Sequence, residues 1–366
     1  ILFWAIFLPW GERFSLDAQK QVDTSPTNDI ANVATVGMIL QTMIVYFVSA
    51  LYKTGEAWRS DGSAAQLALS QLEWNSDLGT YFLHFPKLLV LGTFFVLYLE
   101  LIGPWLLISP VWSEQLRTIT VLAFMSFHMS LEMTMELGVF PYVGIATLIG
   151  LLPALPWQTR PGKKLESRLS RLFLEARWNR RLIRHAGSSQ PLTWRYTPLV
   201  LSTLIVFTLY LNAAGREGEN LPLSRPLGSA ARLLGFDQYW GLFAPEPGRI
   251  GGWFVFEGIF ADGSRIELRT EQPLNWSEPN SSSIYPTQRI KRWMVGLGLE
   301  NFKALRPYQA RYLFNHWDRL HPGHKSQLVR VRGHYLSRPT LPNYEDPGFP
   351  TNYVFLDYTR EQLREL

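Results

Sequence analysis

The chain has 366 residues and a formal net charge of +5, and 47% of its residues are hydrophobic. It contains no cysteine, which excludes disulfides, thiolate catalysis and cysteine-based metal sites. The mean hydropathy of -0.02 is too high for an enzyme exposed only to water and too low for a transporter lying wholly in the membrane. Apolar runs fill the part before residue 215, and charge concentrates in one basic segment and the C-terminal third.

The chain opens with an apolar run over residues 1–10. No basic segment precedes this run and no small-residue cleavage site follows it, so it does not predict a signal peptide. We expect it to be the end of a membrane helix whose beginning is missing, and the sequence to be a piece of a longer protein.

Several later apolar stretches are long enough for a helix to cross a bilayer. They cover residues 31–52, 85–108, 116–136, 138–155 and 196–213. The second stretch contains Lys87, Glu100 and Pro104. The third and fourth meet at Leu137-Gly138, which predicts a tight helical hairpin or one broken helix.

The segment over residues 157–195 carries a strong excess of arginine and lysine. Such an excess beside apolar spans marks the cytoplasmic side of a membrane. Leu165, Leu169, Leu172 and Phe173 recur in it at helical spacing, which predicts a basic amphipathic helix on the inner leaflet. An RNA-binding patch is the alternative, but no aromatic stacking platform accompanies the basic residues.

With that basic loop inside, the last span leads residues 214–366 out of the cytoplasm and places Lys53 on the same outer side. We therefore predict a mostly α integral membrane helical bundle over residues 1–213, followed by an extracytoplasmic α+β domain over residues 214–366. The outer domain has predicted strands at 253–260, 265–269 and 329–335, a hairpin turn at 261–264, helices at 289–294 and 307–317, and an ordered turn at 243–247.

Lys53 directly follows the apolar stretch over residues 31–52. Its amine touches both hydrocarbon and water, so it either snorkels as an interfacial anchor or stays neutral and acts as a base. The lack of an acidic residue within one turn upstream favours the neutral amine. Glu56, three residues downstream, favours a charged one, because the two side chains can pair.

His128, Glu132 and Glu136 follow one another at intervals of four, which puts them on one stripe of a predicted helix. Three interpretations are open: a proton relay, a metal site that lacks its second half, and a polar seam between helices. His128 lies near the middle of its span, where a neutral imidazole can donate or accept a proton. Glu100 is either a buried acid or, when protonated, the donor to a backbone carbonyl freed by Pro104.

The histidines His316, His321 and His324 lie close together in the sequence. No carboxylate stands at ligand spacing beside them, and His321-Pro322-Gly323-His324 is a turn-rich segment. We expect these histidines to face solvent, and we expect no metal.

Two segments resemble those of a known family. Residues 46–53, Tyr-Phe-Val-Ser-Ala-Leu-Tyr-Lys, with Trp58 after them, resemble the segment that holds the catalytic lysine of vitamin K-dependent gamma-glutamyl carboxylases. Phe127-His128, followed by Leu-Gly-Val-Phe-Pro-Tyr-Val at residues 137–143, resembles their histidine-bearing membrane helix at the same internal spacing.

Shorter likenesses occur in the same order along the chain. Residues 13–17 resemble the end of an earlier helix, and Tyr239-Trp240 and the hairpin at 261–263 have counterparts in the lumenal domain of the carboxylases. The ordered set is similar to the bacterial branch, the horizontally transferred transmembrane (HTTM) proteins, and covers most of the chain.

The resemblance implies a mechanism in which a lysine base, here Lys53, deprotonates a hydroquinone. Oxygen then converts the quinol into an alkoxide, this base abstracts a glutamate γ-proton, and carbon dioxide adds to the carbanion. His128 would lie near the reacting centre. Reduced vitamin K or menaquinol is the implied cofactor, and a protein or peptide outside the cytoplasm is the implied substrate. The implied location is a bacterial inner membrane, and no nucleic acid partner is expected.

A second hypothesis is a non-catalytic membrane protein that serves in interaction, maturation or immunity and whose outer domain binds a protein partner. The absence of a recognisable substrate motif and the aromatic content of the outer domain allow it. A transporter is disfavoured, because few spans carry charge and no internal repeat is present.

Overall fold

The computed structural model describes residues 4, 6–7, 33–72, 74–153, 155–175, 197–214, 229, 233, 240–279, 287–323, 326–341 and 348–364. The chain forms two compact units, each assembled from separate stretches of sequence. The helical unit comprises Ile1–Gly55, Phe94–Met129 and Tyr142–Pro245. The sheet unit comprises Glu56–Thr93, Ser130–Pro141 and Glu246–Leu366. The sequence predicts a boundary at residue 213 between a membrane bundle and an extracytoplasmic domain. That boundary divides the chain by the side of the membrane, and it stays a prediction.

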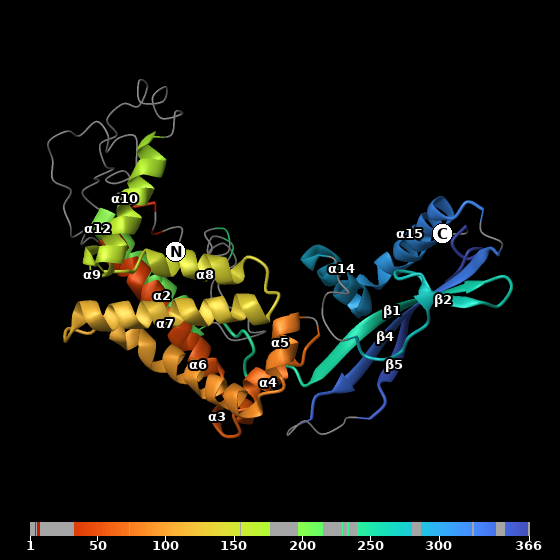
Figure 1. The fold of residues 1–366 in the computed structure, drawn as a ribbon, viewed down its shortest axis with the longest axis horizontal. Helices are drawn as coiled ribbons and strands as arrows, with labels where there is room; N and C mark the ends of the chain where they lie inside the picture. The colour runs from red at the N-terminus through yellow and green to blue at the C-terminus, as the bar shows by residue number, and fades with distance from the viewer. Residues whose placement is uncertain are drawn as a thin grey trace. The chain divides into compact units, whose positions relative to one another are not determined.

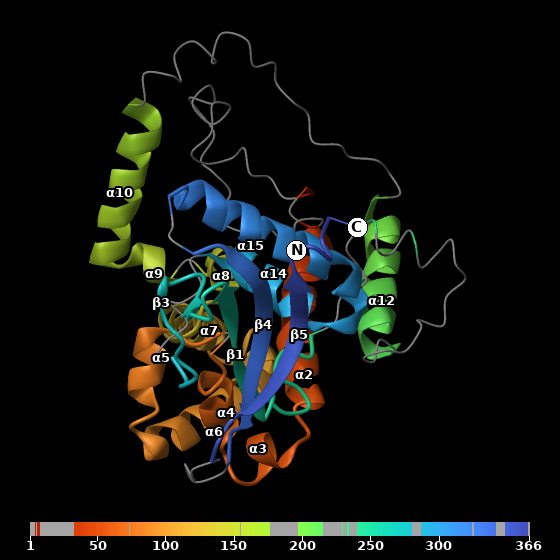
Figure 2. The ribbon, with the colours of Figure 1, turned by 90° about the vertical axis from the view of Figure 1, so that its right-hand side faces the viewer.

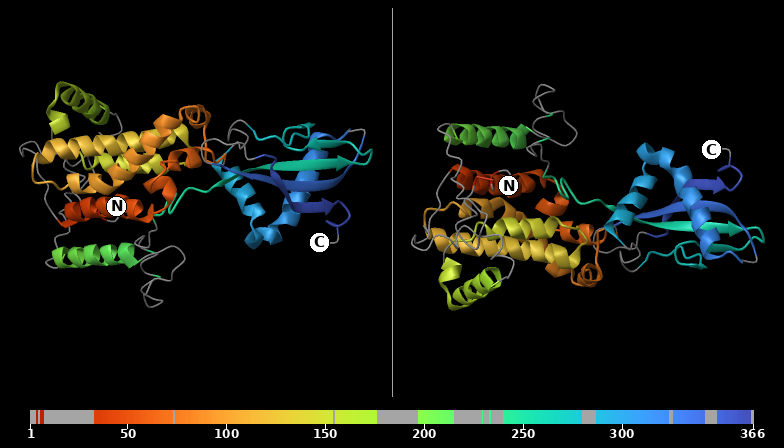
Figure 3. Two further views of the ribbon diagram at one scale, coloured as in Figure 1. Left: turned by 90° about the horizontal axis from the view of Figure 1, so that it is seen from below. Right: turned by 90° about the horizontal axis from the view of Figure 1, so that it is seen from above.

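The long apolar stretches fold as helices, as predicted (Figure 1). Their bounds are α2 (Val33–Tyr52), α6 (Pro86–Leu106), α7 (Ser113–Thr134), α8 (Phe140–Ile149) and α12 (Thr197–Ala214). α12 lies beside α2, as both views in Figure 3 show. The inner faces of these helices share a hydrophobic core that includes Met38, Phe124, Leu148 and Leu201.

The basic segment begins with a short helix, α9 (Leu155–Gln158), and continues as α10 (Arg160–Glu175). α10 confirms the predicted amphipathic helix, because basic and apolar residues alternate along it at helical spacing. The remainder of the predicted basic loop, residues 176–195, lies outside the described residues.

The fourth predicted span is shorter than expected, because α8 ends at Ile149 and Gly150 and Pro153 follow it. Among the helices that the structure describes, α2 and α6 are long and apolar enough to cross a membrane. α7 has the length but also carries Glu114, Arg117 and Glu132.

α6 turns a polar side chain inward and apolar ones outward. Within the helical unit, Glu100 is 4% exposed and Leu97 is buried beside it. Phe95, Ile102 and Trp105 on the opposite face are each at least 50% exposed. A surface helix in water shows the reverse pattern, with its charged residues outside.

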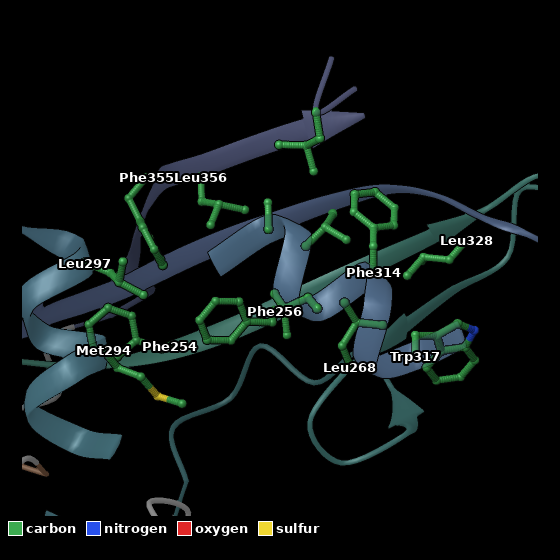
Figure 4. Packing of buried hydrophobic residues seen from close by; sticks show 14 of the residues in the cluster. Phe254, Phe256, Leu268, Met294, Leu297, Phe314, Trp317, Leu328, Phe355 and Leu356 are labelled. Atoms are coloured by element: carbon green, nitrogen blue, oxygen red, sulfur yellow. The ribbon is translucent and has the colours of Figure 1, made fainter. Parts of the chain in front are cut away.

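The sheet unit contains a five-stranded antiparallel sheet in the order β3-β2-β1-β4-β5. Its strands are β1 (Ile250–Phe260), β2 (Arg265–Glu267), β3 (Gln272–Pro273), β4 (Leu328–Pro339) and β5 (Thr351–Thr359). Helices α14 (Gln288–Gly298) and α15 (Arg306–Leu320) lie against one face of the sheet (Figure 2). Phe254, Phe256, Leu297, Phe314 and Trp317 fill the core between them (Figure 4).

Segments that are distant in sequence complete the sheet unit. The short helices α3 (Glu56–Arg59), α4 (Ala64–Leu69) and α5 (Asp77–Phe82) precede α6. Leu72 packs with Trp253, Val255 and Leu336 in a second, smaller hydrophobic cluster. Leu72, from the N-terminal half of the chain, therefore covers part of the sheet.

The hairpin predicted at residues 261–264 is confirmed by the antiparallel pairing of β1 with β2. Gly263 has φ of 84°, a conformation that glycine adopts at little cost. The Asp262 carboxylate accepts a hydrogen bond from the Ser264 backbone N–H at 2.9 Å, which closes the turn.

The other predicted elements of the sheet unit are confirmed, and each is longer than expected: α14, α15 and β4. The segment at 243–247 is an ordered turn, in which Phe243 has a positive φ of 57°. β5 was not predicted.

Candidate active site

The C-terminal half of α2 and the residue that follows it present three polar side chains on one face. Tyr46, Ser49 and Lys53 are spaced by three and four residues, the interval of neighbours on a helix surface. Their exposures are 7%, 8% and 3%, so the face is buried along its length. Buried polar groups require hydrogen-bond partners, and α6 and α7 supply them.

Lys53 is held by one residue of its own helix face and one residue of α6. Its ammonium donates to the Ser49 Oγ at 2.8 Å and to the Glu100 carboxylate. Ser49 is also hydrogen-bonded to Glu100, so the three side chains form a closed triangle. Inside a low-dielectric environment such a pair is strongly coupled, because water does not screen it.

This pairing decides between the two roles considered for Glu100. The residue is a buried acid with a basic partner rather than a donor to the backbone near Pro104. The acidic partner of Lys53 stands 47 residues away in sequence, which is why the residues beside Lys53 did not reveal it. Glu56, the partner considered for Lys53, is exposed at the start of α3.

The second polar pair lies further along the same face of α2. A hydrogen bond of 2.8 Å joins the Tyr46 Oη and the His128 Nε2 on α7. Phe124 stacks on the Tyr46 ring with centroids 3.9 Å apart. His128 is 3% exposed, and Gly144 of α8 packs so closely against its imidazole that a Cβ would collide with the ring. The imidazole is therefore fixed from three helices.

The predicted stripe of His128, Glu132 and Glu136 is wrong for its last member. α7 ends at Thr134, so Glu136 lies beyond the helix and belongs to the sheet unit. Its carboxylate lies 4.0 Å from the ammonium of Lys291. Glu132 is half-buried on α7. Within the described residues no three His, Asp or Glu side chains gather as a metal site would require.

Two of the C-terminal histidines have different partners. His316 stacks on Tyr312, and His321 lies 3.2 Å from the Glu271 carboxylate. His324 lies outside the described residues.

Sequence reasoning selected Lys53 and His128 but assigned no role to Tyr46 or Ser49. The structure places all four in one buried polar cluster together with Glu100. Such a cluster offers an amine beside a carboxylate and a phenol beside an imidazole, which are groups able to hold and pass protons. The spacing of Tyr46, Ser49 and Lys53 by three and four residues is visible in the sequence, and it predicts that the three side chains share one face.

The fold and the cluster define a class of protein: a helical unit with apolar helices around buried ionisable groups, combined with an α+β unit. In this chain, residues 1–154 match the family model of the HTTM domain. No curated protein matches the chain, and no solved structure matches it. The HTTM match includes Lys53, Glu100 and His128, so the whole buried cluster lies inside the matched region. Residues 13–17, which also carry the resemblance, lie outside the described residues.

Proposed function

We propose that the chain is a membrane-embedded, quinol-coupled carboxylase-like enzyme in which Lys53 is the base. The observation that carries this proposal is the buried pair of Lys53 and Glu100, about two helix turns from the pair of Tyr46 and His128. Ionisable groups inside apolar helices are costly to retain, which favours a function for them.

The surface of the helical unit supports a location in the membrane. Phe95, Ile102 and Trp105 of α6 are exposed although they are large and apolar. Exposing such an apolar face to water is unfavourable, whereas contact with lipid hydrocarbon is not. The HTTM match over residues 1–154 and the two helices long enough to span support the same location.

The side chains suit the deprotonation of an acidic hydroxyl. The Lys53 amine can take a proton from a bound hydroxyl, and the Glu100 carboxylate can stabilise the ammonium that forms or take the proton onward. Tyr46 and His128 offer a second site at which a proton can be held. A reduced vitamin K or menaquinol, when bound, would supply with oxygen the strong base that removes a glutamate γ-proton before carbon dioxide adds.

The orientation that accompanies this proposal places α10 at the cytoplasmic face and residues 214–366 outside, in a bacterial inner membrane. The arginine and lysine side chains of α10 support it through the positive-inside rule. The protein or peptide substrate would then meet the protein on its extracytoplasmic side.

A second candidate is a non-catalytic interaction, maturation or immunity factor. The specific observation in its favour is that Lys53 is already paired with Glu100. Such a pair can serve only to fix two helices against each other. In that case the sheet unit would carry the function by binding a protein partner.

An epoxidation assay separates the two candidates. The purified protein in lipid nanodiscs is given reduced vitamin K or menaquinol, oxygen and bicarbonate, and quinone epoxide is measured. We expect Lys53→Ala to abolish epoxide formation, and the matched control Lys87→Ala, an exposed lysine on α6, to retain it. Absence of epoxide with either quinol in folded protein would overturn the enzyme proposal in favour of the binding protein.

A further inference from the structure

In the sheet unit, α14 and the 3-10 helix η3 (Glu300–Leu305) present an apolar face at the surface. Met294 and Leu297 of α14 belong to the core between the helices and the sheet. Trp293, Leu299 and Phe302 are instead 43%, 52% and 46% exposed. The outer side of a helix in water is normally polar, so large exposed apolar side chains that lie together indicate contact with a nonpolar partner.

The three exposed side chains form one continuous surface. They line a single hollow of about 270 Å³, together with Arg292 and with Trp74 from the segment before α5. The lining of this hollow is almost entirely apolar, which suits hydrocarbon groups. The Trp293 Nε1 donates a hydrogen bond of 2.8 Å to the Gln309 side chain of α15, which fixes the indole at the surface.

Basic side chains accompany this apolar face. The segment over residues 287–305 contains one acidic residue and four basic ones: Arg289, Lys291, Arg292 and Lys303. Lys291 is buried, and the other three are exposed. The acidic residue, Glu300, lies 3.8 Å from the Lys303 Nζ and 3.3 Å from the Arg306 Nη2, so its charge is offset within the segment. The face therefore carries a positive charge beside its apolar side chains.

The unit that carries this face also contains the start of a candidate membrane helix. The sheet unit includes Glu56–Thr93, and thereby the first residues of α6 from Pro86 onward. With α6 in the membrane, as proposed above, the unit is held next to the bilayer surface by its own residues. Tryptophan is favoured at the level of the lipid headgroups, and arginine and lysine are attracted to anionic lipids.

We propose that the exposed face of α14 and η3 docks on the surface of the bilayer, with anionic phospholipids as its partner. Arg289 and Arg292 contact lipid phosphates, and the Trp293 indole lies among the headgroups. Leu299 and Phe302 reach the upper part of the acyl chains, and the hollow takes lipid hydrocarbon. The proposal rests on the proposed location in the membrane and does not depend on the proposed catalysis.

The test uses the full chain in nanodiscs, with a fluorescent nitrobenzoxadiazole group on one introduced cysteine. Asn301→Cys places the fluorophore on the exposed face of η3, and Ile102→Cys places it on the exposed side of α6. Lipids with a nitroxide near the top of the acyl chain quench a fluorophore that touches them. We expect quenching of Asn301→Cys in phosphatidylglycerol that weakens in phosphatidylcholine and in high salt, because salt screens the attraction.

Ser277→Cys is the matched control, because it lies on the other face of the sheet. The neighbouring Trp276 contacts His334, which stands opposite Val255 of β1. The helix α14 packs against Phe254, and successive residues of a strand face opposite sides of a sheet. The fluorophore at this position should not be quenched by either lipid.

The reporter positions separate this proposal from the location in the membrane. Quenching of Ile102→Cys, with Asn301→Cys quenched no more than Ser277→Cys, would overturn the docking and leave the location intact. An unquenched Ile102→Cys would overturn the location, and the docking with it. If Asn301→Cys is shielded from lipid nitroxide and from a water-soluble nitroxide alike, a second copy or a protein partner covers the face, which also overturns the proposal.

Further substitutions in the Asn301→Cys chain assign the contact to particular side chains. Arg292→Gln should lower the ratio of docked to undocked protein about fivefold, the effect of one basic residue at an anionic surface. Leu299→Ser should lower it about tenfold through lost apolar burial. Leu320→Ser, at a leucine that is 54% exposed and ends α15 away from η3, is the control and should change nothing. Unchanged quenching in both Arg292→Gln and Leu299→Ser would overturn the proposed contact.

Discussion

Lys53 and Glu100 share a hydrogen bond at a place where each of the two side chains is about 4–5% exposed. Removing one partner leaves the other charge buried and unpaired, which costs about 3–5 kcal/mol, whereas replacing both by apolar residues is often nearly neutral. We therefore expect Glu100→Leu to destabilise the protein strongly and Lys53→Met with Glu100→Leu to restore most of the loss. Thermal unfolding in detergent measures both, and additive losses would show that the two side chains are not coupled.

The contribution of the hydrogen bond between Tyr46 and His128 to stability can be tested by removing one atom. Tyr46→Phe removes the phenol oxygen but keeps the ring that stacks on Phe124. We expect a loss of about 0.5–1.5 kcal/mol, the net value of one hydrogen bond, with more if the His128 nitrogen is left unsatisfied. Tyr98→Phe is the control, because Tyr98 is 54% exposed, and its unfolding temperature should not change.

At the scale of residues, the sequence singled out three of the five members of the cluster. Lys53, Glu100 and His128 are conspicuous because ionisable side chains are rare in or beside apolar stretches. Their pairing is not, because Tyr46 stands 82 residues before His128 and Glu100 stands 47 residues after Lys53. Those distances are closed by packing of α2, α6 and α7, which no local pattern encodes.

At the scale of elements, the close packing of α8 against α7 requires glycine at position 144. Gly144 faces the His128 ring, and a Cβ built there overlaps the imidazole. We expect Gly144→Ala to cost about 1–3 kcal/mol through overpacking. Gly92→Ala on α6 has open space around the new methyl and should be neutral or gain up to about 1 kcal/mol from helix propensity. Unfolding temperatures of the two variants in detergent give the comparison, and equal shifts would contradict the contact.

Strands β4 and β5 are joined by a charged contact that makes the sheet sensitive to acid. The Asp357 carboxylate accepts hydrogen bonds of 2.6 Å from both the Nε and the Nη2 of Arg330, and Arg332 lies 3.2 Å away. Burial by itself raises the pKa of Asp357, but the hydrogen bonds and charges of Arg330 and Arg332 outweigh it, so the pKa is lowered.

A lowered pKa fixes the sign of the pH dependence. The contact stabilises the sheet at pH values above the ordinary carboxyl pKa of about 4, and this contribution is lost as the pH falls through the lowered value. Asp357→Asn should therefore reduce stability at pH 7 and flatten its fall in acid, with a modest size because the side chain is 33% exposed. Denaturant midpoints at pH 7 and below pH 4 measure this. Glu361→Gln, at an exposed position, is the control.

At the scale of elements, length and periodicity predicted most of the helices, together with the hairpin of β1 and β2. The fourth span was predicted too long, because an apolar composition continues past Gly150 and Pro153, where the helix has already ended. β5 was missed because neighbouring residues on it do not alternate cleanly between apolar and polar. Its assignment comes from pairing with β4, a contact between distant parts of the sequence.

For the whole molecule, the proposed orientation in the membrane can be tested by labelling single introduced cysteines, because the chain has no cysteine of its own. Ser277→Cys introduces a thiol after β3, and Ser167→Cys introduces one on α10, both at exposed positions. A membrane-impermeant maleimide added to intact spheroplasts should label Ser277→Cys and reach Ser167→Cys only after lysis, because the basic helix stays inside. The opposite labelling would invert the orientation. A protease added outside should likewise cut within residues 214–366.

The small cluster of Leu72, Trp253, Val255 and Leu336 has a consequence for how this protein can diverge. A gene fusion that joined the C-terminal sheet to another helical region would separate Trp253 from Leu72 and leave part of the sheet without its apolar cover. Recombination at a single breakpoint is therefore disfavoured, although the sequence reads as one region following another. The connecting segments between the apolar helices and the strands of the sheet are expected to change together, substitution by substitution, rather than as exchangeable modules.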